Sequence, residues 1–188
     1  MTIRQSLLPG AALTAMVLAL TQALTLAQAP APASAPASGR LVDNGNETIT
    51  DSQTQLMWEK KTTAPGSGAN LRDPRDVDNT YTWDDAKGDW LDQLNGRLIA
   101  NAGDGSFAGY TDWRLPTLAE LQSILEPGNP PRINAMYGAN AAGPYWSASR
   151  RALGPSAIPW YLIFGNEIPV SVGKPFTFHV RAVRGGRR

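Results

Sequence analysis

The stretch that decides the fold reads Gly109-Tyr110-Thr111-Asp112-Trp113-Arg114-Leu115-Pro116-Thr117-Leu118-Ala119-Glu120-Leu121. It is typical of the start of a helix. Thr117 suits the N-cap position, and Glu120, three residues later, completes a capping box by accepting from the Thr117 backbone N–H. Pro116 stiffens the chain just before the cap. The stretch therefore predicts a short helix over residues 118–125, which ends before Pro127-Gly128.

Strands are predicted on both sides of this helix. Residues 40–43 and 48–50 flank Asn44-Gly45-Asn46, whose Asn and Gly accept positive φ, so the two segments are predicted to form a hairpin. Four further strands follow from apolar runs or alternation, at residues 56–58, 145–149, 160–164 and 168–172. The third of these is apolar on both faces, which favours a central position in a sheet. In a last strand Phe176, Phe178, Val180 and Ala182 share one face, opposite Thr177, His179 and Arg181.

A longer helix is predicted to begin at Thr82, with Asp84 and Asp85 favourably placed in its first turn. Its apolar stripe consists of Trp83, Ala86, Trp90, Leu91, Leu94 and Leu98. Gly88 weakens the helix by roughly 1 kcal/mol relative to Ala. Residues 63–79 are almost devoid of apolar side chains and are expected to form a long surface loop, and residues 129–143 are expected to be another long irregular stretch. Strands at both ends, two helices and long irregular loops indicate an α+β domain.

The N-terminus resembles an export signal. Arg4 precedes an almost uncharged apolar run at residues 11–27, and small residues then favour cleavage before Gln28, with Pro30 as the alternative first residue. The other interpretation, an uncleaved anchor, requires a span at the short limit for crossing a bilayer. We expect a signal peptide at residues 1–27, an Ala/Pro-rich linker at 28–39, a single domain at 40–186 and a basic tail at 187–188. The protein is then exported, periplasmic or extracellular, with no stable membrane span.

The composition bears on stability and on partners. The chain has no cysteine, so a disulfide framework is excluded and the six tryptophans are the expected anchors of the core. Removal of Arg4 with the signal leaves 16 basic and 16 acidic residues, a net charge of zero. The charge is uneven, since residues 72–92 carry a net −4 and residues 132–188 a net +7. This asymmetry favours either a surface that faces a polyanion or two segments that neutralise each other after folding.

Chemical sites are few. His179 is the only imidazole, and no Ser or Cys partner stands near it in a nucleophile motif, so we expect no enzyme activity. Residues 101–106 and Glu126-Pro127-Gly128-Asn129 carry oxygen ligands that could suit calcium, but turn chemistry accounts for both. We therefore expect no metal, no cofactor and no nucleic-acid partner.

The candidate residues fall into a structural group and a binding group. We interpret Trp113, Arg114, Pro116, Thr117, Glu120 and Trp146 as scaffold, with Arg114 bonded to a carboxylate or to backbone carbonyls. Arg132, Arg150, Arg151 and Lys174 are the cations expected to be exposed, with Tyr145, Trp160 and Tyr161 as stacking faces. Arginine forks suit sulfate and carboxylate. The alternative for Arg150-Arg151 is that the pair only keeps a loop soluble.

Three parts of the chain together resemble a known family. The Trp113–Leu121 stretch, Tyr145-Trp146-Ser147-Ala148-Ser149 and the closing Val180-Arg181-Ala182-Val183-Arg184 are similar to the Lcl C-terminal domain family, over roughly residues 40–185. Arg114 to Glu120 is also similar, more distantly, to formylglycine-generating enzymes. The resemblance implies a C-type-lectin-like α+β fold. The cysteines on which the formylglycine chemistry depends are absent here, so that activity is not implied.

The family is mostly of unknown function, and some members resemble surface adhesins that bind sulfated polysaccharide. Our first hypothesis is thus an exported binding module for an acidic glycan or an envelope partner, acting through the basic surface of residues 132–188. The second is a structural or assembly domain of the envelope that contacts another protein. The third is a hydrolase with a carboxylate pair that the sequence does not identify.

Overall fold

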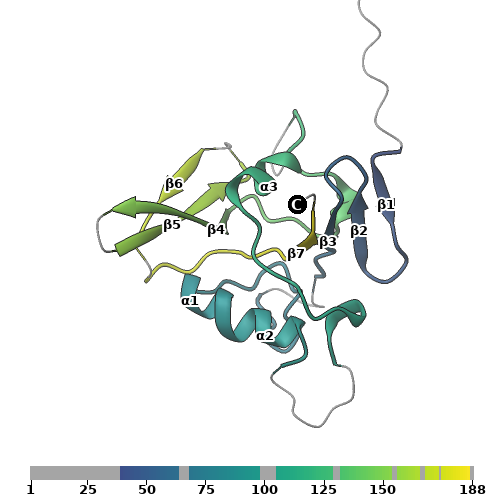
Figure 1. Ribbon diagram of the computed structural model, residues 1–188, viewed down its shortest axis with the longest axis horizontal. Helices are drawn as coiled ribbons and strands as arrows, with labels where there is room; N and C mark the ends of the chain where they lie inside the picture. Colours follow the sequence, from purple (N-terminus) through teal and green to yellow (C-terminus); the bar gives the residue numbers. More distant parts are fainter. Residues whose placement is uncertain are drawn as a thin grey trace, which may run out of the picture. The chain divides into compact units, whose positions relative to one another are not determined.

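A computed structural model describes residues 39–63, 68–97, 105–128, 132–153, 156–165, 168–173 and 175–186. Two antiparallel sheets, a helical segment of residues 83–94 and a short helix α3 make up this part of the chain (Figure 1). The predicted α+β class is therefore confirmed, with sheet as the larger component. The predicted signal and most of the linker lie outside the described residues, as do Lys174 and the basic tail.

The first sheet joins the two ends of the domain. It has the strand order β1-β2-β3-β7, with β1 at Leu41–Asp43, β2 at Thr48–Asp51, β3 at Leu56–Glu59 and β7 at Val183–Gly185. The predicted β1–β2 hairpin is confirmed, and its turn places Gly45 at a φ of 75°. Asn44 fastens the turn because its Nδ2 donates to the hydroxyls of Thr48 and Thr50. Strand β7 closes the sheet by pairing with β3 from the far end of the sequence.

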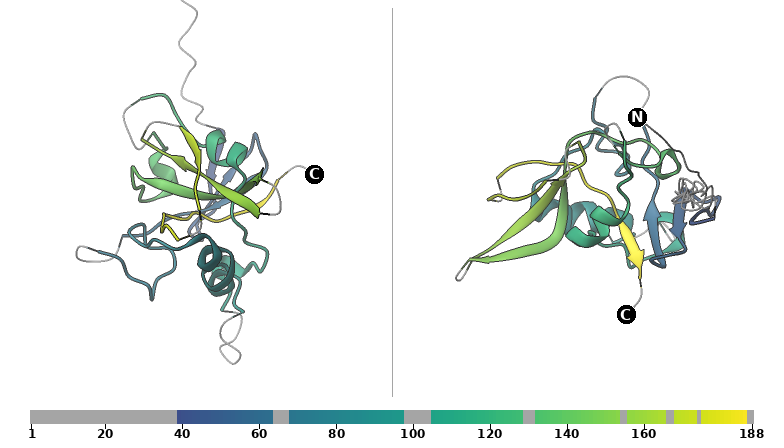
Figure 2. Two further views of the ribbon diagram at one scale, coloured as in Figure 1. Left: turned by 90° about the vertical axis from the view of Figure 1, so that its left-hand side faces the viewer. Right: turned by 90° about the horizontal axis from the view of Figure 1, so that it is seen from above.

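The second sheet is built on a long hairpin. Strand β4, Pro144–Leu153, pairs with β5, Ser156–Ile163, and β5 pairs in turn with β6, Pro169–Ser171. The central position predicted for the 160–164 segment is confirmed. Strand β6 reaches only the part of β5 from Trp160 to Leu162, so the distal half of the hairpin continues beyond β6 and projects outward (Figure 2).

The predicted long helix begins at Thr82, whose hydroxyl accepts from the Asp85 backbone N–H. It consists of α1 (Trp83–Asp85), a π-helical turn at Ala86–Trp90 and α2 (Leu91–Leu94). Four members of the stripe are buried, namely Trp83, Ala86, Trp90 and Leu94. Leu98, the last predicted member of the stripe, lies outside the described residues.

Helix α3 spans Leu118–Ser123, slightly shorter than predicted, and its N-terminus carries the predicted capping box. It lies between the two sheets (Figure 1). Leu121 and Ile124 pack there with Ile49 and Trp58 of the first sheet and Leu162 of the second. A second core cluster is formed by the buried side of helices α1 and α2 together with Trp113, Leu115, Trp146, Val180 and Ala182.

Two expectations are corrected in part. Residues 63–79 were predicted to form a surface loop, but within its described part Asp76 and Asn79 are each only 1% exposed. Their burial is possible because backbone groups partner them: Asn79 Nδ2 donates to the carbonyls of Asn70 and Asp73, and Asp76 accepts from the Asp78 N–H. The last predicted strand, residues 176–182, contains only isolated bridges at Phe178 and His179, and the strand β7 begins after it at Val183. Arg181, on its polar side, is completely buried. Both segments are covered by neighbours that sequence periodicity does not reveal.

Candidate functional site: the projecting hairpin and the hollow beside helix α3

The two neighbouring arginines of the hairpin lie on opposite faces. Arg150 is opposite Pro159 in the β4–β5 register, and Arg151 is opposite Ile158. Because successive side chains of a strand alternate between the faces, the two cations cannot form a single bidentate patch. Both side chains are exposed. The hairpin thus presents one arginine on each face.

The face that carries Arg150 brings it to Trp83, at the start of the helical segment. The Arg150 Cζ lies 5.4 Å from the centroid of the Trp83 ring, and the Lys87 Nζ lies 4.4 Å from it. The indole is held in place because its Nε1 donates to the Ser147 carbonyl of β4. Two cations from elements far apart in sequence therefore converge on one ring, an arrangement stabilised by the negative face of the π system.

A row of aromatic rings extends along the same side of the hairpin. Trp146 lies opposite Tyr161, and the centroid of Phe178 is 4.4 Å from that of Trp146 and 4.5 Å from that of Tyr161. Phe176 continues the row, with its ring centroid 6.2 Å from that of Phe178, and it is 51% exposed. Trp146 is buried and donates from Nε1 to the Tyr81 carbonyl, two residues before Trp83. The row therefore runs from the core to an exposed ring.

The opposite face of the hairpin carries Arg151, Ile158 and Trp160. Arg151 is opposite Ile158, which shares its face with Trp160, two residues further along β5. Trp160 and Tyr161 are both half-buried. Tyr161 belongs to the aromatic row on the Arg150 side, so the two aromatic candidates from β5 lie on different faces.

Tyr145 is not a surface residue. It was expected to offer a stacking face, but its side chain is 0% exposed. Its ring stacks on Phe164 with centroids 4.0 Å apart, and its hydroxyl accepts from the Ala141 N–H. The prediction is wrong because Tyr145 faces the first core cluster, while its neighbour Trp146 faces the second.

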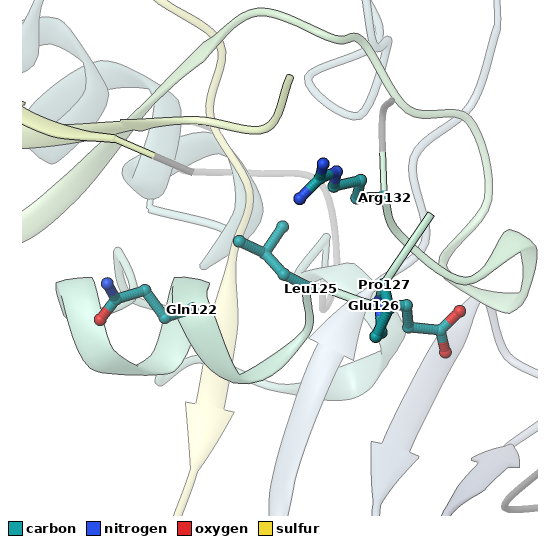
Figure 3. Close-up of a pocket in the computed structure, with 5 residues that line it drawn as sticks. All are labelled: Gln122, Leu125, Glu126, Pro127 and Arg132. Atoms are coloured by element: carbon teal, nitrogen blue, oxygen red, sulfur yellow. The ribbon is translucent and has the colours of Figure 1, made fainter. Parts of the chain in front are cut away.

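Arg132 lies at a hollow of about 380 Å³ beside the C-terminal end of α3. Gln122, Leu125, Glu126, Pro127 and Arg132 line it. Figure 3 shows the Arg132 guanidinium turned toward the side of Leu125, whereas the Glu126 carboxylate points away from it. Arg132 has a φ of 53°, a left-handed conformation uncommon for residues other than glycine.

The described positive charges of residues 132–186 do not gather on one face. Arg181 is buried, and Arg184 bonds Asp112, with 2.6 Å between its Nε and Oδ1. Arg150 lies against the helical segment, which belongs to the acidic stretch of the sequence. The idea of one basic surface is thus corrected. The predicted neutralisation of one segment by the other stays a prediction, because Asp112 lies outside residues 72–92 and the contact of Arg150 is with the Trp83 ring.

Arg181 instead organises the interior. Its Nη1 donates to the carbonyls of Glu59 and Tyr137 at 2.9 Å, and its Nη2 donates to Asn140 Oδ1 at 2.7 Å. The Glu59 carboxylate accepts from the Ala182 N–H and pairs with Lys61, 2.8 Å from its Oε1. Burial lowers the pKa of Lys61, and the charge of Glu59 opposes this effect. This buried network fixes the closing segment of the chain and is inaccessible to a ligand.

The scaffold residues of the Trp113–Leu121 stretch contact one another and the closing segment. Arg114 bonds both carboxylate oxygens of Glu120, at 2.8 and 2.7 Å. Glu120 also accepts from the Thr117 N–H at 2.7 Å. Trp113 and Pro116 are buried, and the Arg114 backbone pairs with Val183. The stretch therefore anchors α3 to the end of the chain.

His179, the one imidazole of the sequence, contacts the backbone and an aromatic ring. His179 Nδ1 lies 2.9 Å from the Val77 carbonyl, and its ring lies against Tyr145. Burial lowers the pKa of His179, partly opposed by its contacts with backbone carbonyls. Among the described residues no group of three His, Asp or Glu side chains could hold a metal ion. The possible calcium loop at 101–106 lies mostly outside them.

Sequence reasoning missed three residues of the candidate surface. Lys87 stands four residues after Trp83, a spacing that places side chains on one helix face, and this signal could have found it. Phe176 and Phe178 were placed on one face with Val180 and Ala182, and alternation alone does not show that Phe176 is exposed. Within the described residues, no helix is both long and apolar enough to cross a membrane.

The comparisons with known proteins agree with the scaffold described above. No curated protein matches the chain. The family model of the Lcl C-terminal domain matches residues 47–184. The match begins just before β2 and ends within β7, so it contains the Trp113–Leu121 stretch, the β4–β5 hairpin and the buried Arg181. The chain belongs to the Lcl C-terminal domain family.

Proposed function

We propose that the protein is an exported, non-catalytic binding module for acidic or sulfated glycans, and that it acts in the periplasm or outside the cell. In this proposal the domain adopts a C-type-lectin-like arrangement. The contact surface is the Arg150 face of the β4–β5 hairpin, together with Lys87 and the exposed end of the aromatic row.

One observation carries the proposal: Lys87 and Arg150 converge on Trp83 beside a row of rings that ends at Phe176. A sulfated sugar offers two complementary features. Its sulfate groups suit the arginine fork and the ammonium group, and the C–H face of its ring suits an aromatic surface. The site is pre-organised, because Trp83 is fixed by its bond to Ser147. Rigid placement lowers the entropic cost of binding.

The non-catalytic part of the proposal rests on the state of the only imidazole. His179 is half-buried and engaged with Val77, and its depressed pKa keeps the ring neutral at physiological pH. A half-buried ring whose Nδ1 is engaged by a backbone carbonyl is suited to structure rather than to proton transfer at an exposed substrate.

Retention on immobilised heparin tests the proposal. Lys87→Ala/Arg150→Ala should elute at lower salt than the parent, because fewer fixed cations contact the polyanion. Arg97→Ala is the matched control, since Arg97 is an exposed arginine at the far end of the helical segment, paired with Asp92. Arg151→Ala reports on the opposite face and should have the smaller effect. A parent protein that passes through heparin and sulfated glycan columns at low salt would refute the proposal.

A second candidate, an assembly domain that acts through protein contacts, is favoured by the edges of the hairpin. Strand β6 pairs with β5 from Trp160 to Leu162, and the Val172 N–H adds a bond to the Pro159 carbonyl. On β4 the Ala148 N–H donates to the Pro116 carbonyl, and the pairing with β5 then continues from Arg150 to Leu153. The distal half of the hairpin, where residues 150–153 pair with residues 156–159, thus has backbone edges that another strand could join. Light scattering and cross-linking across a concentration series test this candidate. A strictly monomeric protein that still binds heparin favours the glycan module.

A further inference from the structure

Strand β4 is interrupted by a bulge directly before Arg150. The β4–β5 register shifts between Trp146 and Arg150, so that residues 147–149 of β4 stand against Trp160 alone on β5. A bulge of this kind bends its strand and redirects the side chains next to it. The first side chain after the bulge is that of Arg150, whose guanidinium lies over the Trp83 ring. The bulge therefore sets the position of one cation of the proposed ligand surface.

Two hydrogen bonds fasten the bulge to the start of helix α3. The Ala148 N–H donates to the Pro116 carbonyl at 2.7 Å, and the Leu118 N–H donates to the Ser149 hydroxyl at 3.0 Å. Leu118 is the first residue of α3, where an N–H has no acceptor within the helix, so Ser149 caps the helix from another segment. The Ser149 N–H donates in turn to the Ser147 hydroxyl at 3.0 Å. The hydroxyl of Ser149 thus joins the helix to the bulge.

The same bulge holds the aromatic ring beneath Arg150. The Ser147 carbonyl accepts from Trp83 Nε1 at 3.0 Å, and the Ser147 side chain is completely buried. The bulge is therefore tied to α3 through Ser149 and to the indole through Ser147, and Arg150 follows it over that indole.

We propose that Ser149 is a positioning residue of the ligand surface. Its bond to the start of α3 fixes the bulge, and the bulge holds Arg150 over Trp83, while Ser149 itself does not contact the ligand. A cation that is held in place before the ligand arrives loses less conformational entropy on binding. The inference rests on the proposed glycan function and adds to it the residue that orients one of its two cations.

Ser149→Ala tests the proposal, and Thr117→Ala is the matched control. Each variant removes one hydroxyl that accepts from an N–H in the first turn of α3, namely that of Leu118 for Ser149 and that of Glu120 for Thr117. The two variants should lose similar stability, whereas only Ser149→Ala should elute from immobilised heparin at lower salt than the parent. Its affinity should fall by at most about fivefold, because the net contribution of one neutral hydrogen bond corresponds to that factor in an equilibrium constant.

Ser149→Thr keeps the hydroxyl and should retain the heparin affinity of the parent. The proposal would be overturned if Ser149→Ala and Thr117→Ala eluted at the same salt concentration.

A double-mutant cycle with Arg150 separates positioning from direct contact with the ligand. In the Arg150→Ala background, Ser149→Ala should lower heparin retention little further, because the guanidinium that Ser149 positions is already absent. Arg151→Ala is the control background, since Arg151 lies on the opposite face of the hairpin, and there Ser149→Ala should keep its full effect. A loss as large in the Arg150→Ala background as in the parent would mean that Ser149 acts independently of Arg150, and the proposal would be rejected.

NMR of the ligand-free protein distinguishes failure of this inference from failure of the function on which it rests. The Trp83 ring shields protons of the Arg150 side chain, so Ser149→Ala should move their signals toward the values of an unfolded chain. The Trp83 indole N–H should shift as well, whereas that of Trp113, which donates to the Phe107 carbonyl, should not.

If these shifts occur but the parent ignores heparin, Ser149 positions Arg150 and the glycan function is refuted. If the parent binds heparin but the Arg150 and Trp83 signals of Ser149→Ala match those of the parent, the positioning role is refuted and the glycan function stands.

Discussion

Lys61 Nζ lies 2.8 Å from Glu59 Oε1, and neither side chain is more than 4% exposed. The pair links β3 to the segment that follows it, and it lies beside the buried Arg181, which donates to the Glu59 carbonyl. Glu59, Lys61 and Arg181 therefore form a buried group of charged side chains. Lys61 and Arg181 support the closing segment of the chain and are not accessible to a ligand.

Removal of one partner of this pair should strongly destabilise the protein. We expect Lys61→Met to lower the free energy of unfolding by about 3–5 kcal/mol, because the Glu59 charge is left buried without its partner. Lys61→Met/Glu59→Gln should recover part of the loss. Urea denaturation of both variants measures this difference. A double variant no more stable than Lys61→Met would contradict the electrostatic explanation.

His179 should make stability depend on pH. Its pKa in the folded protein is lowered from 6.5, chiefly by burial, so the unfolded chain binds the proton more readily. Between the two pKa values stability therefore rises with pH, and it levels off above about 6.5. As pH falls from that value through the folded pKa, stability is progressively lost. His179→Gln should flatten this part of the pH profile in thermal unfolding. An NMR titration that places the folded pKa above 6.5 would reverse the expected sign.

The close approach of Gly138 to Lys61 should make this glycine irreplaceable. A Cβ at position 138 would lie 2.3 Å from the Lys61 carbonyl oxygen, and the φ of 81° is itself unfavourable for other residues. Gly138→Ala should lower the unfolding free energy by more than about 1 kcal/mol. Gly88→Ala is the control, since nothing lies within 4 Å of its Cβ position. That change in the helical segment should be neutral or stabilising by up to about 1 kcal/mol.

The helix cap of α3 should contribute to stability without contributing to binding. Thr117→Ala removes the hydroxyl that accepts from the Glu120 N–H, and should cost about 1 kcal/mol. Chemical denaturation measures the loss, and heparin retention should not change. A variant as stable as the parent that no longer binds heparin would assign a ligand role to Thr117.

Glu120 should add an acid-dependent component to the same cap. Burial opposes its ionisation, but bonds from Arg114 and Thr117 prevail and lower its pKa below 4.5. The stabilisation is thus present above that value and is lost as pH falls through the folded pKa. Glu120→Gln should reduce the loss of stability on acidification, which thermal unfolding between pH 3 and 5 would show.

Local chemistry determined the elements that the sequence predicted correctly. Thr117 and Glu120 satisfy backbone groups within one turn of helix, and Asn44 and Gly45 form a turn among adjacent residues. Interactions of this kind involve neighbours in the chain, so their signature is visible in the sequence. The family motif could be read for the same reason, because its residues stand together at 113–121.

Only the tertiary structure decided which charged and aromatic side chains reach solvent. Arg181 and Arg150 are the same type of residue. Arg181 is nevertheless buried and bonds the carbonyls of residues 59 and 137, whereas Arg150 lies on the Trp83 ring at the surface. Tyr145 and Trp146 likewise depend on which side of β4 each core cluster covers. These outcomes are set by contacts between segments far apart in sequence, and neither local propensity nor periodicity carries information about such partners.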